Sequence, residues 1–293
     1  SKEEQNATLA GCQYQYAATD KNGEKLWAVF NERCIKELGK RKKPKDFILT
    51  IGGTGQQAIA EAHQDLITVE YSIGYVGSFS RYRVYESHYW RAWSTGKQQS
   101  PDGRFFDEVI PLFFDENEFT FRKEKEPFAL FVGRLTPKKG LSIACQAAEK
   151  AGVQLKVIGH GDTSLVTHGA EYLGAVSMQE RNDWMSRASV LICPTLYIEP
   201  FGSIAVEAQL CGTPVVSTAW GGFIETIEHG RTGYHCNYLG EFVRGLQDAQ
   251  SLDHAYIRQR AVALYSIQNI KYQYQRYFDR LLLLWDDGFN SLN

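Results

Sequence analysis

Residues 197–216 read YIEPFGSIAVEAQLCGTPVV, and the turn and apolar runs in this stretch indicate how the second half of the chain folds. The apolar run SVLICPT at 189–195 leads into it and predicts a strand, the PFG turn begins a helix, and TPVVST at 213–218 predicts the next strand. A strand, a helix and a second strand in this order are typical of a βαβ unit with parallel strands. Two carboxylates, Glu199 and Glu207, lie on either side of the turn.

The same alternation runs through the whole second half of the chain. The expected strands are FALFVG at 128–133, QLKVIGHG at 154–161, SVLICPT, TPVVST and TGYHC at 232–236, and the expected helices are 138–152, 177–188, 202–212 and 222–230. Right-handed crossovers then give a doubly wound, Rossmann-like domain with helices on both faces of a parallel sheet. We expect this domain to span 128–265, and the helical pattern after it predicts a closing helix at 266–293.

The first half is shorter and less regular. It shows a helix at 24–39, strands at 46–53 and 66–71 with a short helix between them, and a last strand at 107–114. These elements predict a first Rossmann-like domain at 1–114, joined to the second by a polar linker at 115–127. The opening 22 residues are polar and show no strand, so we expect this domain to be incomplete.

Composition excludes several classes of protein. A net charge of −2 in 293 residues argues against a general nucleic-acid binder. The six cysteines are dispersed, which favours reduced thiols in a cytoplasmic protein over a disulfide framework or a zinc site. The start of the sequence is not a signal peptide, and no uncharged apolar run is long enough to span a bilayer. At most, peripheral membrane contact is expected.

Ligands of doubly wound sheets bind at the carboxyl ends of the strands, so the loops after the strands are the candidate sites. In GRLTPKKG at 133–140, Arg134 and Lys139 lie beside a helix start and suit an anion, although a solvated basic turn is the alternative. GHGD at 159–162 lets a ligand approach the backbone. It is not the glycine fingerprint of nicotinamide dinucleotide binding, because Ser164 stands where the third glycine belongs.

The opening stretch adds a helix start between two acids. The free amides around Gly202, Ser203 and Ile204 suit a phosphate group. Glu199 precedes them and Glu207 lies about one turn further along the helix. Acids on both sides of a phosphate site fit a nucleotide sugar, with a ribose diol on one side and a sugar on the other. Spacing alone favours the plainer alternative of one helix-start acid and one surface acid.

Several motifs resemble the family 4 retaining glycosyltransferases. EPFGSIAVE at 199–207 looks like their E-x7-E motif, FVGRLTPKKG at 131–140 like their G-R-L-x-x-x-K-G segment, and residues 210–234 like their third motif, in the family's order. The resemblance implies the GT-B fold, in which two Rossmann-like domains face a cleft and the last helix crosses back to the first domain. It also implies an enzyme of the hexosyltransferase type, which takes a sugar from a UDP- or GDP-linked donor with retained configuration.

The resemblance also implies roles for single residues. Arg134 and Lys139 would neutralise the donor diphosphate, Glu199 would contact the donor sugar beside the reacting centre, and these three are the expected catalytic residues. Glu207 would hold the ribose hydroxyls. The residues expected to bind the donor are Gly133, Gly161, Gly174, Val176, Phe201, Gly202, Ser203, Ile204 and Glu207.

No D-x-D metal motif is present, so we expect no metal and no cofactor apart from the nucleotide-sugar co-substrate. The acceptor is unknown. Two alternatives stay open: a GT-B nucleotide-sugar epimerase, and a nucleotide-sugar-binding protein with weak hydrolase activity and no efficient transfer. The shortened first domain is the reason to keep the second alternative.

Three features of the first half have two interpretations each. The segment 71–93, with eight aromatic residues and three arginines, is either a platform for a sugar or anionic acceptor or an aromatic-rich core helix after a loop. The basic run KRKKPK at 40–45 is either a contact for anionic membranes or a solvated helix end. His63, His88 and His160 are candidate acceptor-site bases or structural histidines.

Overall fold

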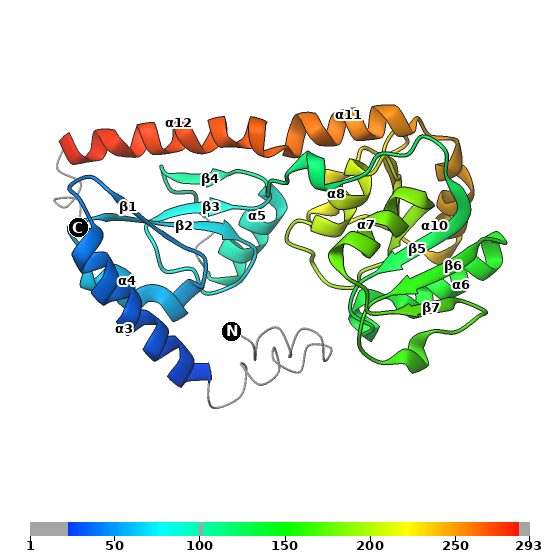
Figure 1. Cartoon of the computed structure of the whole chain (residues 1–293), viewed down its shortest axis with the longest axis horizontal. Helices are drawn as coiled ribbons and strands as arrows, with labels where there is room; N and C mark the ends of the chain where they lie inside the picture. Colours follow the sequence, from blue (N-terminus) through cyan, green and yellow to red (C-terminus); the bar gives the residue numbers. More distant parts are fainter. Residues whose placement is uncertain (1–22, 100–101, 287–293) are drawn as a thin grey trace. The chain divides into compact units, whose positions relative to one another are not determined.

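A computed structural model describes residues 23–99 and 102–286. The chain divides into two compact units (Figure 1). The first unit comprises residues up to Ile110 together with the segment from Lys271 onward, and the second unit runs from Pro111 to Ile270. Each unit holds one parallel sheet, as predicted.

The second unit contains a six-stranded sheet whose order is β10-β9-β8-β5-β6-β7, with every pair parallel. Its strands are β5 Glu126–Val132, β6 Gln154–Ile158, β7 Glu171–Gly174, β8 Ala188–Cys193, β9 Val215–Thr218 and β10 Gly233–Cys236. The chain winds from β5 toward β7 in one direction and from β8 toward β10 in the other. The order therefore reverses between β5 and β8, and a reversal of this kind creates a crevice at the carboxyl ends of those two strands.

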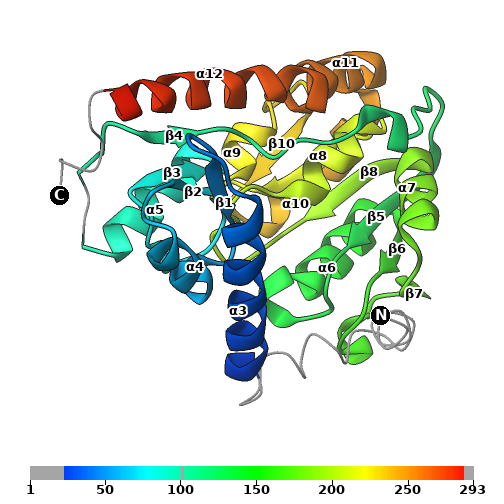
Figure 2. The same ribbon diagram turned by 60° about the vertical axis from the view of Figure 1, so that its left-hand side comes forward.

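Helices cover both faces of this sheet (Figure 2). They are α6 Leu141–Ala151, α7 Met178–Arg187, α8 Ser203–Leu210, α9 Phe223–Thr226, α10 Leu239–Asp248 and α11 His254–Tyr265, with 3-10 turns at Glu116–Glu118, Pro137–Lys139, Thr163–Leu165 and Ala249–Ser251. Alternate strand residues feed two cores, because successive side chains point to opposite faces. Phe128 and Leu130 pack with α7, α8 and α11, whereas Ala129 and Phe131 pack with α6 and α10.

The first unit contains four parallel strands in the sequential order β1-β2-β3-β4. They are β1 Phe47–Thr50, β2 Ile67–Ile73, β3 Tyr82–Tyr85 and β4 Asp107–Val109. The helices are α3 Gly23–Arg41, α4 Gln57–Ala62, α5 His88–Lys97 and the part of α12 Ile267–Asp286 from Lys271 onward, with a 3-10 turn at Gly53–Gln56. α12 packs in this unit, where Phe278 and Trp285 lie 5.0 Å from Phe47 between ring centroids. A possible strand before residue 23 lies outside the described residues, so the incomplete first domain stays a prediction.

The crossover from β2 to β3, residues 74–81, contains no helix and is held instead by a buried acid. Glu70 on β2 is fully buried and accepts hydrogen bonds from the Tyr75 hydroxyl at 2.8 Å and from the Phe79 and Ser80 amides at 2.9 and 3.1 Å. These bonds satisfy a carboxylate that would otherwise be costly to bury. Glu70 thereby fixes the loop at the carboxyl end of β2.

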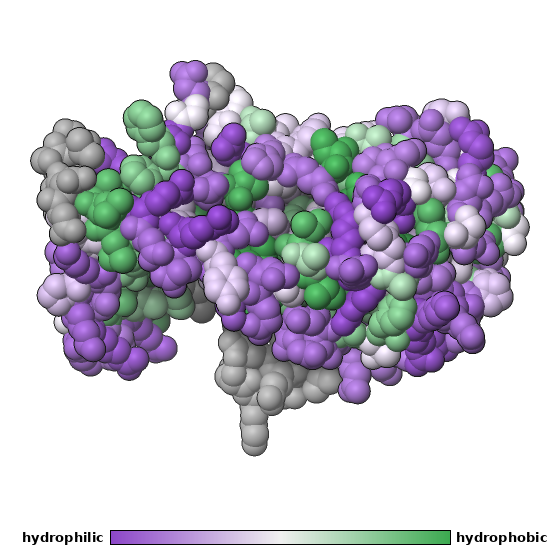
Figure 3. All heavy atoms as spheres, turned by 90° about the horizontal axis from the view of Figure 1, so that it is seen from above, coloured by the Kyte–Doolittle hydropathy of each residue, from purple (hydrophilic) through white to green (hydrophobic). Residues whose placement is uncertain are grey.

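No helix of the described residues is long and apolar enough to cross a membrane. In the view of Figure 3, the described residues of each unit are mainly hydrophilic, and the hydrophobic areas are small and separate. Surfaces of this kind are ordinary for a water-exposed face.

The ammonium group of Lys125 joins the ends of two helices in the second unit. Its Nζ donates to Ser186 O at 2.8 Å in the last turn of α7, to Cys211 O at 2.9 Å at the end of α8, and to Thr213 Oγ1 at 2.9 Å. A cation at helix carbonyl ends is favourable, but its burial is not. Burial lowers the pKa of Lys125 from 10.5 to about 8.

We expect Lys125→Met to lower the free energy of unfolding by about 3 kcal/mol, because it leaves buried acceptors without a donor. Lys123→Met, at an exposed lysine two residues away, is the matched control and should cost little. Because the pKa of Lys125 is lower in the folded protein, the unfolded chain binds more protons between about pH 8 and 10.5. The stability difference between wild type and Lys125→Met should therefore widen with pH in that window, as urea unfolding would show, and a constant difference would contradict this account.

Candidate active site

The loops after β5 and β8 meet at the point where the strand order reverses. A Cβ atom added to Gly140 would lie 1.9 Å from Pro194 O, so the two backbones are in direct contact there. The Leu196 amide donates to Lys138 O at 2.8 Å and fixes the same pair of loops. The sequence predicted that these loops share one edge, and the structure confirms it.

The other two predicted loops join them. The Leu135 amide donates to His160 O at 2.8 Å, which ties the loop after β6 to the loop after β5. On the opposite side, the Gly222 amide donates to Glu199 O at 2.7 Å, which ties the loop after β9 to the loop after β8. A Cβ on Gly159 would lie 1.8 Å from Gly133 O, so this packing depends on glycine.

Lys139 and Glu199, predicted as catalytic residues, are brought into direct contact. Lys139 Nζ donates to Glu199 Oε2 at 2.8 Å, and the two side chains are only 19% and 17% exposed. Burial by itself lowers the pKa of the Lys139 ammonium, but the carboxylate of Glu199 and the side chain of Tyr197 outweigh burial and raise that pKa. The cation therefore stays charged at neutral pH.

Arg134 occupies a different position from Lys139. It lies two residues after the end of β5 and is exposed, and its guanidinium makes no hydrogen bond or ion pair with any residue of the described part. An unengaged guanidinium at a strand exit is available to an anionic ligand. The structure thus offers two cations at this edge: Lys139, held by Glu199, and Arg134, whose guanidinium has no polar partner among the described residues.

The start of α8 has no side-chain cap. Gly202 adopts a left-handed conformation with φ of 85°, and a side chain there would collide with Phe223, whose ring lies 2.6 Å from the position of the added Cβ. The first helical amides, those of Ser203 and Ile204, have no intrahelical acceptor, as in any helix start. They remain available to an anion at the edge of the sheet.

Glu207 lies on the second turn of α8 and has an incompletely satisfied carboxylate. Its Oε2 is 2.9 Å from Arg181 on α7, yet this contact is misaligned for a hydrogen bond, and the buried oxygen accepts none from the described residues. Burial raises the pKa of Glu207, and Arg181 offsets only part of that effect. A buried acceptor without a donor is costly, and a ligand hydroxyl would satisfy it.

The remaining residues predicted to bind the nucleotide-sugar donor lie in different environments. Gly174, at the end of β7, accepts a hydrogen bond from the Gly159 amide at 3.0 Å, so the loops after β6 and β7 adjoin, and Gly161 is exposed beside them. Val176 packs partly against the core. Phe201 is 3% exposed and stacks edge-on against Tyr265, so its side chain faces the core and only its backbone borders the site.

Two residues that sequence reasoning missed belong to this site. Arg181 approaches Glu207 from a different helix, and Tyr197 lies under Lys139, with the ammonium 4.9 Å from the ring centroid. The position of Arg181 in the sequence gives no signal that it belongs to the site. Tyr197 could have been noticed as an aromatic residue two positions before Glu199 in a strand-exit loop.

Among the described residues, no three histidine, cysteine, aspartate or glutamate side chains are grouped so that they could hold a metal ion. The cysteines in this part of the chain are free thiols, and four of them are buried: Cys145, Cys193, Cys211 and Cys236. Cys12 lies outside the described residues.

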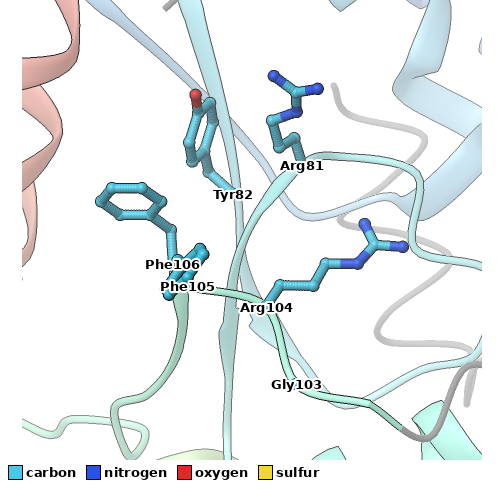
Figure 4. A pocket seen from close by; sticks show the side chains of 6 residues that line it. All are labelled: Arg81, Tyr82, Gly103, Arg104, Phe105 and Phe106. Atoms are coloured by element: carbon cyan, nitrogen blue, oxygen red, sulfur yellow. The ribbon is translucent and has the colours of Figure 1, made fainter. Parts of the chain in front are cut away.

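The aromatic and arginine segment at 71–93 is divided between strand, loop and helix. Arg81 and Tyr82 line a cavity with Arg104, Phe105 and Phe106 at the amino ends of β3 and β4, and Figure 4 shows the aromatic rings on one side of β3 and both guanidinium groups on the other. The expected helix begins only at His88. This cavity lies at the edge of the sheet opposite the carboxyl ends of the strands.

The other first-half candidates have structural explanations. Lys40 and Arg41 pair with Glu37, and Lys42 pairs with Asp65, which fits a solvated helix end better than a membrane contact. His63 is 5% exposed, and its ring nitrogen lies 3.0 Å from Ile35 O, so it is part of the core.

Residues 113–239 match the family model described as glycosyl transferases group 1. The chain is 34% identical over 152 residues to an uncharacterized glycosyltransferase of Methanocaldococcus jannaschii, a match that covers 44% of this chain and 39% of that protein. The chain therefore spans about two fifths of the length of this curated relative.

Solved structures resemble the chain over most of its length. Sucrose-phosphate synthase from Thermosynechococcus elongatus matches with a TM-score of 0.73 at 20% identity, covering 90% of this chain and 80% of that one. Anabaena HepE in complex with UDP and glucose matches with a TM-score of 0.69 at 18% identity, covering 85% and 81%. Two parallel-sheet α/β domains and these neighbours confirm the predicted GT-B fold class.

Proposed function

Because residues 113–239 match the family model described as glycosyl transferases group 1, we propose that the protein is a retaining, metal-independent glycosyltransferase of the hexosyltransferase type. Its donor is a nucleotide-diphosphate sugar, UDP- or GDP-linked, and its acceptor is a hydroxyl compound whose identity stays open. The observation that carries the proposal is the contact between Lys139 and Glu199 at the reversal of strand order, beside an uncapped helix start.

The diphosphate of the donor is proposed to lie at the start of α8. The amides of Ser203 and Ile204 donate to its oxygens, and Lys139 and Arg134 neutralise its charge. When the bond between the sugar carbon and the diphosphate breaks, the electron pair goes to the phosphate oxygen. Fixed cations stabilise the charge that develops there, so these groups lower the barrier without a divalent ion.

Glu199 and Glu207 are proposed to hold the two ends of the donor. Glu199 accepts hydrogen bonds from sugar hydroxyls near the reacting carbon. Glu207 accepts from the ribose hydroxyls, which its buried Oε2 can do because it accepts no hydrogen bond from the described residues. The acceptor hydroxyl then attacks from the face that the diphosphate leaves, its proton passes to the departing phosphate oxygen, and the configuration is retained.

Two further observations support parts of the proposal. UDP and glucose are bound in HepE, which shares the fold, and this supports a nucleotide-linked sugar as the donor class. The free, buried thiols of the second unit suit a reducing compartment, so we propose a cytoplasmic reaction.

A nucleoside diphosphate should stabilise the protein without added metal. At a concentration of 100 times Kd the stabilisation is about 2.7 kcal/mol, which is readily seen as a rise in the thermal midpoint, and EDTA should not reverse it. A panel of UDP, GDP, ADP and their sugars would identify the donor. Strict dependence of binding on a divalent ion would refute metal independence, and no stabilisation by any member of the panel would refute the proposed function.

Product analysis with a labelled donor separates transfer from the alternatives. A glycosyltransferase moves the label to an acceptor, an epimerase returns the label in a different sugar, and a binding protein releases it slowly as free sugar.

A further inference from the structure

Tyr197 provides a second partner for the cation at the centre of the site. Its ring lies under Lys139, with the ammonium 4.9 Å from the ring centroid, while Glu199 holds the same ammonium at 2.8 Å. Tyr197 is half-buried, so solvent screens this contact only in part. A cation over an aromatic face is attracted by the electron density of the ring.

The backbone of Tyr197 is fixed on both sides. The indole Nε1 of Trp220 donates to Tyr197 O at 3.2 Å, and the amide of the preceding Leu196 donates to Lys138 O at 2.8 Å. The second bond joins the neighbour of Tyr197 to the neighbour of Lys139. The two loops that carry Tyr197 and Lys139 are therefore bonded to each other, and this backbone bond does not involve the side chain of Glu199.

In the proposed function, binding of the nucleotide sugar changes the hydrogen-bond partners of Glu199. In the structure its Oε2 accepts from Lys139, whereas in the proposed donor complex the same carboxylate accepts from sugar hydroxyls. A lysine side chain carries its ammonium on a flexible four-carbon stem. The ammonium is a strongly hydrated point charge, so it moves easily when a partner is lost. Some other group must keep the ammonium directed at the diphosphate.

We infer that Tyr197 is the positioning residue for Lys139, whose ring face holds the ammonium in place while Glu199 turns to the donor sugar. This inference rests on the proposed function. Tyr197 acts through Lys139 and needs no contact with the donor itself.

The hydroxyl of Tyr197 also interacts with Lys139 and Glu199, but we assign the positioning of the ammonium to the ring face. Burial, and then the negative charge of Glu199, raise the pKa of Tyr197, so the ring stays neutral and keeps its attraction for a cation. The charged and titratable groups around Lys139 are Glu199, Tyr197 and the buried thiol of Cys193, whose pKa burial raises to about 12. Because burial raises the pKa of both Tyr197 and Cys193, these two groups stay neutral near pH 7.

The test compares Tyr197→Leu, which removes the ring, with Tyr197→Phe, which keeps it. Tyr197→Leu should weaken binding of the nucleoside diphosphate about tenfold, while binding of the nucleoside without phosphate should stay unchanged. Tyr197→Phe should bind within about twofold of wild type. The matched control is Tyr256→Leu, which removes another tyrosine under a cation, that of Arg231 at 4.0 Å, and should change neither affinity.

A double-mutant cycle decides whether Tyr197 acts through Lys139. In a Lys139→Met background, Tyr197→Leu should have no further effect on diphosphate affinity, because there is no cation left to position. Additive effects, or an equal loss of nucleoside and diphosphate affinity, would show a general structural role and overturn the inference. If wild type binds no nucleoside diphosphate, the proposed function fails and this inference with it; binding by wild type with no effect of Tyr197→Leu overturns the inference alone.

Discussion

Replacing Glu199 by alanine should lower kcat by about 100- to 1,000-fold, the usual range when a fixed polar group at the reacting centre is removed. Nucleoside diphosphate affinity should change by less than about threefold, because the amides of α8 and the cations remain. Loss of Glu199 removes one partner of the Lys139 ammonium, and we expect the ring of Tyr197, 4.9 Å away in the structure, to keep the ammonium near the site. Separate measurement of kcat and of the Kd for the nucleoside diphosphate tests this split.

Glu207→Ala is the counterpart and should show the reverse. It removes the acceptor proposed for the ribose hydroxyls, so nucleotide affinity should fall about 10- to 100-fold while kcat at saturating donor changes little. Glu171→Ala is a suitable control, because Glu171 is a half-exposed acid of the same unit that pairs with Lys156. If Glu207→Ala leaves nucleotide affinity unchanged, the ribose assignment is wrong, and equal losses of kcat in both variants would remove the distinction between the two acids.

The sequence predicted which loops form the site but not which side chains touch within it. Alternating strands and helices imply parallel strands, and the carboxyl ends of parallel strands share one edge, so the positions of residues 133–140 and 195–203 follow from topology. The bond between Lys139 and Glu199 spans 60 positions in the chain and depends on how two loops fold back. No periodic pattern contains that information.

Phe201 and Arg181 show that the position of a residue relative to a motif does not predict where its side chain points. Phe201 lies in the most informative motif, yet the turn directs its side chain into the core against Tyr265. Arg181 lies outside every recognised motif, yet α7 places it beside Glu207. Motif position indicates where the backbone of a site lies, whereas the direction of each side chain depends on the neighbouring elements.

In the first unit, the hydrophobic pattern of the sequence predicted the strands and helices less well than in the second unit. The strand Tyr82–Tyr85 is buried at every position and is only four residues long, so it has neither the alternation of a half-buried strand nor the length that identifies a buried one. The helix after it begins where Ser87 caps it, with Ser87 Oγ accepting from the Trp90 amide at 3.0 Å. Serine is a common N-cap residue, so the sequence is compatible with a helix that begins after Ser87. The aromatic residues before Ser87 made the start of that helix difficult to locate from the sequence alone.

Gly140 lies at the amino end of α6. Gly140→Ala should destabilise the protein by about 3 kcal/mol more than Gly152→Ala, at the other end of the same helix. The two glycines have nearly the same left-handed conformation, with φ of 72° and 69°. The strain of placing alanine in that conformation, about 1–2 kcal/mol, is therefore common to both and cancels in the comparison.

What differs is the space around each glycine. An added Cβ at Gly152 meets no atom within 4 Å, whereas at Gly140 it would lie 1.9 Å from the carbonyl oxygen of Pro194, a backbone atom that cannot turn aside. Relief of that contact must separate the loop that carries Lys139 from the loop that carries Glu199. We therefore expect Gly140→Ala to weaken nucleoside diphosphate binding as well, while Gly152→Ala binds like wild type. Urea unfolding and the Kd for the nucleoside diphosphate measure the two effects, and equal destabilisation by both substitutions would show that the loops after β5 and β8 are not packed backbone against backbone.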